Sequence, residues 1–143
     1  MESQKFSSEI KNVQENFKIE GKFKLSYMDS KETGYFVLNK EGNTVSLNVG
    51  KNYLLPEKII ILDMRETLNI NEFIEDNILP YNLPILKVER FLQLLLGLDS
   101  KDIQDEEKVF EIETKGSHDY PSEVTLLYKD LNLLMKVKKI WKN

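Results

Sequence analysis

The residues whose types could support catalysis are few and lie apart in the sequence. The single histidine, His118, stands between Ser117 and Asp119. Serine, histidine and aspartate form the triad of many hydrolases, but neighbours in sequence do not meet in triad geometry. Adjacent residues of a strand point to opposite faces, and a loop presets no arrangement. We therefore interpret these residues as a solvated loop before Pro121 and predict no catalytic residue.

The carboxylates and glycines form no recognisable site either. The acidic stretch from Asp102 to Glu107 has the oxygen ligands that calcium prefers, but it lacks the alternating spacing and central glycine of a calcium-binding loop. The six glycines are scattered and make no phosphate-binding loop. The absence of cysteine excludes disulfides, thiolate metal sites and cysteine nucleophiles. We expect neither an enzyme, nor a metal site, nor a cofactor.

Length and charge narrow the function classes further. The 143 residues fit one domain spanning 1–143, with 41% hydrophobic and 31% charged residues. The net charge of −4 argues against a nucleic-acid partner, because phosphate contacts need clustered basic residues. No uninterrupted apolar run approaches the roughly 18 residues of a membrane-spanning helix.

Hydrophobic spacing predicts the elements of the first half of the chain. Apolar residues recur at spacings of three and four within residues 1–16, which predicts an N-terminal helix. From residue 17 to residue 64 the period is two, which predicts antiparallel strands joined in hairpins. The last of these strands, from Lys58 to Met64, is apolar on both faces, so we expect it to be covered on both.

The second half of the chain is expected to hold helices and then more strands. Residues 69–98 predict a helical lid made of two helices, one capped by Asn69 or Asn71 and one from Ile85 to Leu96. Residues 108–141 predict the C-terminal strands. Strands in sequential hairpins with helices clustered between them indicate an α+β domain built on an antiparallel sheet.

Two segments place large apolar side chains where surface residues are expected. The connection after Gly50 contains Tyr53, Leu54 and Leu55. It reads either as a strand end tucked under a helix or as a protruding apolar tip that touches lipid or a lipidated partner. The helix from Ile85 to Leu96 is apolar nearly all round, which fits either deep core or a lid over a cavity that an acyl chain can enter.

Four stretches of the chain carry distinctive patterns. They are a glycine-containing first strand, a Gly-x-aromatic-x-apolar strand, a proline-bearing segment that leads into a helix ending in Gly, and a strand-turn-strand that ends in Trp. Their sequences are NFKIEGKFKLSY (16–27), TGYFVLN (33–39), LPYNLPILKVERFLQLLLGL (79–98) and YPSEVTLLYKDLNLLMKVKKIW (120–141). In this order they resemble the LolB-like outer-membrane lipoprotein receptor family of Gram-negative bacteria, within the wider LolA/LolB fold.

The resemblance implies a curved, incomplete antiparallel half-barrel whose open side is plugged by the N-terminal helix and the two central helices, with a hydrophobic cavity inside. The family receives acylated lipoproteins in the periplasm and inserts them into the outer membrane through a loop with an exposed leucine. Here that loop is Lys51 to Pro56, with Leu54 or Leu55 in the corresponding place, so Tyr53, Leu54 and Leu55 are the expected membrane-contacting residues.

The resemblance also implies a location and partners. We expect the periplasmic face of the outer membrane, acylated lipoproteins or lipids as ligands, a periplasmic LolA-like carrier, peripheral membrane contact and a monomer. Family members begin with a signal peptide and a lipid-modified cysteine, which this sequence lacks. The expectation is that Met1 replaces a trimmed export and anchor segment, and a cytoplasmic location stays open.

Strand parity and helix face select the residues expected to line an acyl-chain cavity, and a parity error would exchange each for its neighbour. They are Phe23, Leu25, Phe36, Leu38, Leu47, Ile61, Phe91, Leu95 and Met135. Two alternatives stay open. One is a periplasmic lipid- or glycolipid-binding module of the same fold. The other is a non-enzymatic adaptor domain with a packed interior, which would bind through the Leu54–Leu55 loop and the lysine-rich C-terminus.

Overall fold

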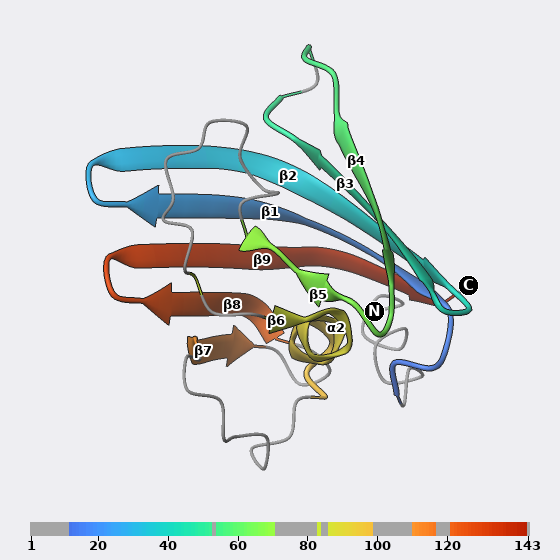
Figure 1. The fold of residues 1–143 in the computed structure, drawn as a ribbon. Coiled ribbons are helices and arrows are strands. Elements are labelled where there is room, and N and C mark those ends of the chain that lie inside the picture. Colours follow the sequence, from blue (N-terminus) through green and yellow to red (C-terminus); the bar gives the residue numbers. More distant parts are fainter. Residues whose placement is uncertain are drawn as a thin grey trace.

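The architecture is that of one curved antiparallel sheet (Figure 1). It was obtained as a computed structural model, which describes residues 12–52, 54–70, 83, 86–98, 110–116 and 121–142. The sheet has seven strands in the order β4-β3-β2-β1-β9-β8-β7. The strands are β1 (Phe17–Tyr27), β2 (Ser30–Glu41), β3 (Thr44–Gly50), β4 (Lys58–Asp63), β7 (Glu111–Gly116), β8 (Pro121–Tyr128) and β9 (Leu131–Lys142).

Apolar alternation gives the long strands one buried and one exposed face. In β1, for example, Phe17, Ile19 and Phe23 are buried, whereas Lys22 and Lys24 between and beyond them are exposed. The first and last strands of the chain pair with each other at the centre of the sheet, with a register shift between Glu20 and Gly21. The two ends of the described chain are thus joined by main-chain pairing.

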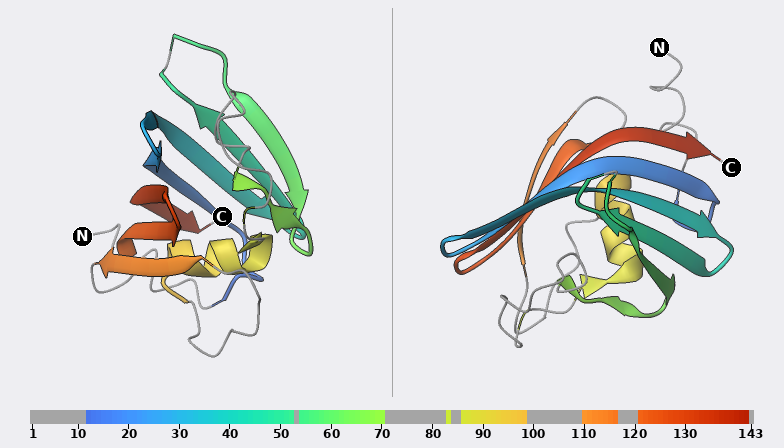
Figure 2. Two further views of the ribbon diagram at one scale, coloured as in Figure 1. Left: turned by 60° about the vertical axis from the view of Figure 1, so that its left-hand side comes forward. Right: turned by 90° about the horizontal axis from the view of Figure 1, so that it is seen from above.

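Two glycines allow β1 and β2 to pack large rings against their own backbone. Gly21 lies directly opposite Phe36, and Gly34 lies directly opposite Phe23. A Cβ atom on Gly21 would collide with the Lys136 carbonyl and would lie 2.7 Å from the Phe36 ring. Glycine in a strand often marks such a close approach, and an aromatic cross-strand neighbour compensates for the missing side chain. The long strands are curved along their length (Figure 2).

The helix α2 (Val88–Leu96) lies on the concave side of the sheet (Figure 2). Its first turn is fixed by a short ladder, in which β5 (Thr67–Leu68) pairs with β6 (Leu86–Lys87). Its last turn ends at Gly97, whose left-handed backbone (φ 74°) is the usual helix stop. Six residues of α2 are buried against the sheet: Val88, Phe91, Leu92, Leu94, Leu95 and Leu96.

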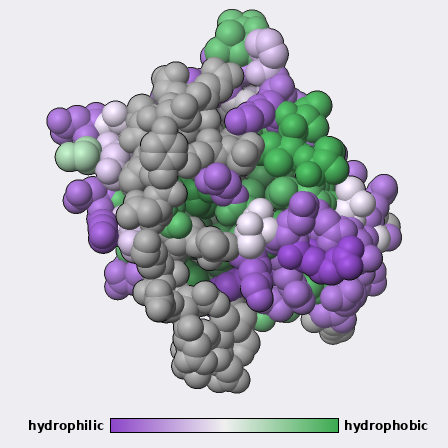
Figure 3. Space-filling view, in the orientation of Figure 1, coloured by the Kyte–Doolittle hydropathy of each residue, from purple (hydrophilic) through white to green (hydrophobic). Residues whose placement is uncertain are grey.

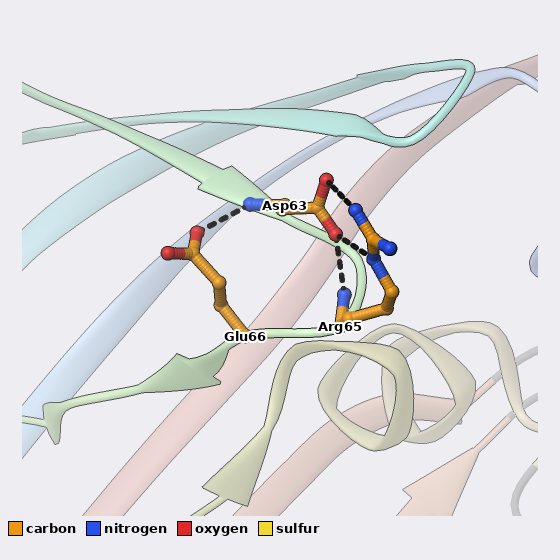
Figure 4. A network of polar contacts seen from close by, with 3 residues as sticks. All are labelled: Asp63, Arg65 and Glu66. Carbon is orange, nitrogen blue, oxygen red and sulfur yellow. Dashed lines mark hydrogen bonds and ion pairs between the residues drawn. The ribbon is translucent and has the colours of Figure 1, made fainter.

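A polar turn carries the chain from β4 at the edge of the sheet toward this helix (Figure 4). Asp63 accepts hydrogen bonds from the Arg65 amide (2.8 Å) and from Arg65 Nε (2.9 Å), and these bonds hold the pKa of the Asp63 carboxyl below its usual range. Glu66 Oε1 accepts a bond from the Asp63 amide, and the Glu66 carbonyl accepts one from the amide of Val88. The turn therefore positions the start of α2.

The expected α+β fold class, a half-barrel plugged by an N-terminal helix and two central helices, is wrong. The described part of the chain is mostly β, with one seven-stranded sheet and a single nine-residue helix. Residues 12–16 form turns, and residues 1–11 lie outside the described residues. Within the expected lid of residues 69–98, residues 71–82, 84 and 85 also lie outside them.

The second central helix is shorter than predicted for a physical reason. Leu86 and Lys87 are held extended by their pairing with Leu68 and Thr67, so helical geometry begins only at Val88. A ladder of two residues is too short to show a hydrophobic period in the sequence. The apolar run from Ile85 onward was therefore predicted to be one continuous helix.

Candidate functional site

The loop between β3 and β4 carries the most exposed large apolar side chain of the described chain, Leu54. Leu54 is 94% exposed and Leu55 is 51% exposed. Tyr53, the third expected residue of this loop, lies outside the described residues. The loop projects beyond the rest of the sheet (Figure 1), and its tip is apolar surface (Figure 3).

Side-chain and backbone hydrogen bonds give the tip a defined shape. Asn52 Oδ1 accepts a bond from the Leu54 amide (2.8 Å), and the Asn52 carbonyl accepts one from the Leu55 amide (3.3 Å). Asparagine commonly makes such turns, because its side chain bonds to the backbone two residues on. The turn leaves both leucine side chains in solvent.

Polar contacts at the base of the loop tie it to the sheet. Tyr35, which is buried, donates through its hydroxyl to Glu57 Oε2 (2.9 Å), and Asn48 Nδ2 donates to Glu57 Oε1 (3.0 Å). Lys51 Nζ lies 3.2 Å from Glu32 Oε1 on β2. Because both ends of the loop are anchored by such contacts, its exposed tip is presented on a fixed base.

Beyond Glu57 and Lys58, two further apolar side chains are exposed on β4. Ile59 and Ile61 are each 62% exposed. They lie opposite Asn48 and Ser46, on the outer face of the sheet, whereas Ile60 lies opposite the buried Leu47. The prediction that Ile61 lines an interior cavity was therefore wrong, because its neighbour Ile60 is the residue that faces the inner side. The expected cover on both faces of this strand was also wrong, because β4 is an edge strand whose outer face is exposed.

The other eight predicted lining residues come together on the inner side. All are at most 4% exposed and belong to one continuous hydrophobic cluster between the sheet and α2. They are Phe23, Leu25, Phe36, Leu38, Leu47, Phe91, Leu95 and Met135. Their mutual packing is what an ordinary core requires, and their contact with an acyl chain stays a prediction.

Residues considered for catalysis or metal binding are not placed. Ser117, His118, Asp119 and the stretch from Asp102 to Glu107 lie outside the described residues. Among the residues that the structure does describe, no group of histidine and carboxylate side chains is arranged to hold a metal ion. None of the helices in that same part is both long and apolar enough to cross a bilayer.

Sequence reasoning missed Ile59 as an exposed residue. Its signal was present in the unbroken apolar run of residues 59–62 before Asp63, since a strand that is apolar on both faces can also be an edge strand with an exposed apolar face. Together with Leu54, Leu55 and Ile61, it forms what we call the apolar ridge of the β3–β4 hairpin.

Comparison with known proteins finds a likeness among solved structures but none among sequences. No protein-family model matches the chain, and no curated protein matches it. Among solved structures, a LolA superfamily protein, NE2245 from Nitrosomonas europaea, superposes with a TM-score of 0.47 and 7% sequence identity. The match covers 99% of this chain and 92% of that one. The expected membership of the LolB-like family stays a prediction.

Proposed function

We propose that this protein is a non-catalytic, peripherally membrane-bound domain that receives and delivers acylated lipoproteins, with the β3–β4 loop as its membrane contact. The observation that carries the proposal is the 94% exposure of Leu54 on a loop whose base is fixed to the sheet. A single exposed apolar residue is normal on a protein surface, but exposed apolar residues gathered in one place, here Leu54 and Leu55 on one projecting tip, indicate an interaction site. Residues 79–98 and the other stretches quoted above add the resemblance to lipoprotein receptors.

The size of the tip suits a reversible membrane contact. Full burial of a leucine side chain is worth about 1.5–3 kcal/mol relative to exposure. Leu54 and Leu55 together could then contribute at most about 3–6 kcal/mol, which is a weak anchor. Such a contact can form and break repeatedly, which suits a protein that inserts one lipoprotein after another.

The proposed ligand is the acyl part of a lipoprotein. Burial of hydrocarbon yields about 0.8 kcal/mol per CH₂ group, so acyl chains can bind without directional contacts. The concave side of the sheet, where Phe91 and Leu95 of α2 meet the strands, is the proposed place of entry. The proposed partners are a LolA-like carrier and the periplasmic face of the outer membrane, with the protein as a monomer.

A second candidate, an adaptor domain with a packed interior, is favoured by one observation. The eight inner residues predicted to line a cavity are packed into one core. On this reading the apolar ridge would bind a protein and no acyl chain would enter. Binding of a fluorescent fatty-acyl probe that an acylated lipopeptide displaces supports the lipoprotein proposal, whereas a folded protein without saturable binding supports the adaptor.

The loop itself is tested by a single charge at its tip. We expect Leu54→Glu to leave the unfolding free energy nearly unchanged, because the side chain is exposed, but to reduce binding to lipid vesicles at least tenfold. A tenfold loss corresponds to about 1.4 kcal/mol, which is within the burial energy of one leucine. Vesicle co-sedimentation measures the binding.

The matched control is Met28→Glu in the turn between β1 and β2. Met28 is 69% exposed and is also apolar, but it lies outside the β3–β4 loop. Equal vesicle binding by Leu54→Glu and the unchanged protein would overturn the proposed contact. An equal loss in both variants would show a general effect of added negative charge.

A further inference from the structure

A pocket of about 580 Å³ lies on the outer face of the sheet, opposite to α2, beside the base of the β3–β4 loop. Its lining comes from β1, β2 and β9 and from the first two residues of the loop, Lys51 and Asn52. The charged lining residues are Lys22, Lys24, Lys51 and Lys136. None of the described residues that line the pocket is acidic. We call it the lysine pocket.

Strand register, not sequence proximity, assembles these charges. Lys22 of β1 lies directly opposite Tyr35 of β2 on one side and directly opposite Lys136 of β9 on the other. Lys24 lies opposite Thr33 and Leu134 in the next row of the same face. The pocket therefore has a cationic rim over a floor that includes Tyr35 and Leu134.

The arrangement is unfavourable for the protein alone. Directly opposed residues of antiparallel strands have Cβ atoms about 4.5–5.5 Å apart, and like charges in such a pair are destabilising. Lys136 forms an ion pair with Glu123 (3.8 Å), and Lys51 forms one with Glu32 (3.2 Å). Within the described part of the chain, Lys22 and Lys24 have no ion-pair partner. An anion between Lys22 and Lys136 would remove the repulsion.

We propose that the lysine pocket binds a phosphate group that carries an apolar or neutral substituent. Lysine binds phosphate as a point charge, and several ammonium groups that converge on one site suit a multivalent oxyanion. The tyrosine and leucine side chains in the floor would contact the substituent. The chain as a whole has a net charge of −4, so this group of four lysines has the opposite sign to the protein that carries it.

Two sources could supply this chemistry, a phospholipid head group or a free phosphorylated molecule. The site does not depend on the proposed membrane contact, although Lys51 begins the loop that carries Leu54. Three probes separate the sources: inorganic phosphate, glycerol 3-phosphate and a short-chain phosphatidylglycerol used below its micelle concentration. Calorimetry and thermal unfolding report binding at about 0.15 M salt, where charges more than about 8 Å apart are largely screened.

The decisive variant is Lys22→Gln with Lys136→Gln. We expect saturable binding to the unchanged protein and at least a tenfold weaker affinity in the double variant. The melting temperature of the double variant without ligand should equal or exceed that of the unchanged protein, because the like-charge pair is gone. Bound phosphate should raise the melting temperature of the unchanged protein more than that of the Lys22→Gln, Lys136→Gln variant. The control, Lys87→Gln with Lys138→Gln, removes the same charge from exposed residues outside the pocket and should bind as the unchanged protein does.

The relative affinities of the three probes identify the source of the phosphate group. Tighter binding of short-chain phosphatidylglycerol than of glycerol 3-phosphate supports the site with a lipid source, and equal binding of the two supports it with a free-phosphate source. Absence of saturable binding by all three probes overturns the proposal, as does equal loss in the two double variants. Leu54→Glu should retain binding of the soluble probes, so a failure of the membrane contact is distinguishable from a failure of the pocket.

Discussion

Lys40 shows how a single side chain can violate the hydrophobic pattern and still be accommodated. It follows Leu38 on the inner face of β2 and is only 1% exposed. Its ammonium donates to the Glu15 carbonyl (2.9 Å) and lies 5.9 Å from the centre of the Phe17 ring. Burial lowers the pKa of Lys40, and the nearby Glu15 charge acts in the opposite direction. The carbonyl of the preceding turn thus compensates in part for a buried charge.

Lys40→Met should reveal the energetic cost of burying this charge, through the pH dependence of the unfolding free energy. Since the pKa of Lys40 in the folded protein lies below its ordinary value of 10.5, the unfolded chain binds more protons between these two values. The unfolding free energy of the unchanged protein should therefore rise, relative to Lys40→Met, as pH increases through that window. Denaturant titrations across alkaline pH measure the difference.

The exposed lysine Lys138 provides the control, as Lys138→Met. Its titration curve should run parallel to that of the unchanged protein. If Lys40→Met and Lys138→Met show the same pH dependence, Lys40 does not carry a buried charge.

The face of the sheet on which a residue lies could be predicted from the sequence only where apolar and polar residues alternate. The low exposure of Phe23, Leu38 and Met135 follows from alternation alone, since each lies on the inner parity of a long strand. The error at Ile61 arose because every residue from Ile59 to Leu62 is apolar. The sequence therefore does not show which of these residues face the inner side of the sheet. Only the pairing of Ile61 with Ser46 places it outside.

At the scale of elements, α2 is the part whose role most separates the two functional readings. Leu95 has 0% exposure and belongs to the core cluster that joins α2 to the sheet. Truncation of a packed core leucine typically destabilises a protein by about 2–5 kcal/mol, because it leaves a cavity. A leucine that merely borders a ligand cavity has fewer protein contacts to lose.

We therefore expect Leu95→Ala to lower the free energy of unfolding by about 2–5 kcal/mol, measured by denaturant titration without ligand. Gln93→Ala, on the partly exposed side of the same helix, is the matched control and should change it by less than about 0.5 kcal/mol. A loss at Leu95 no larger than that at Gln93 would contradict its place in a packed core.

The elements themselves were predictable where their signals were local. The span of β1 follows from alternation between Phe17 and Tyr27, and the end of α2 follows from Gly97. The ladder of Thr67–Leu68 with Leu86–Lys87 was not predictable, because two residues have no period and their partners are distant in sequence. The lysine pocket was missed for a similar reason: lysines alternating along β1 look like an ordinary solvated face until β9 places Lys136 beside Lys22.

At the scale of the whole molecule, the sheet presents three different surfaces. The concave face packs against α2, the outer face carries the lysine pocket, and the β3–β4 hairpin forms an apolar projection at one edge (Figures 1 and 3). The pocket borders the base of that projection through Lys51. With the apolar tip among the acyl chains of a membrane, the cationic pocket at the base of the loop would lie nearer to the phosphate groups.

The central claim, that the tip of the β3–β4 loop enters the membrane, can be measured directly because the chain has no cysteine. A nitroxide attached to Leu54→Cys should become accessible to oxygen and protected from a water-soluble relaxation agent when vesicles are added. The same label at Lys138→Cys should stay in water. If the label at Leu54 remains as accessible to the water-soluble agent as the label at Lys138 while the protein is bound to vesicles, the loop is not the membrane contact.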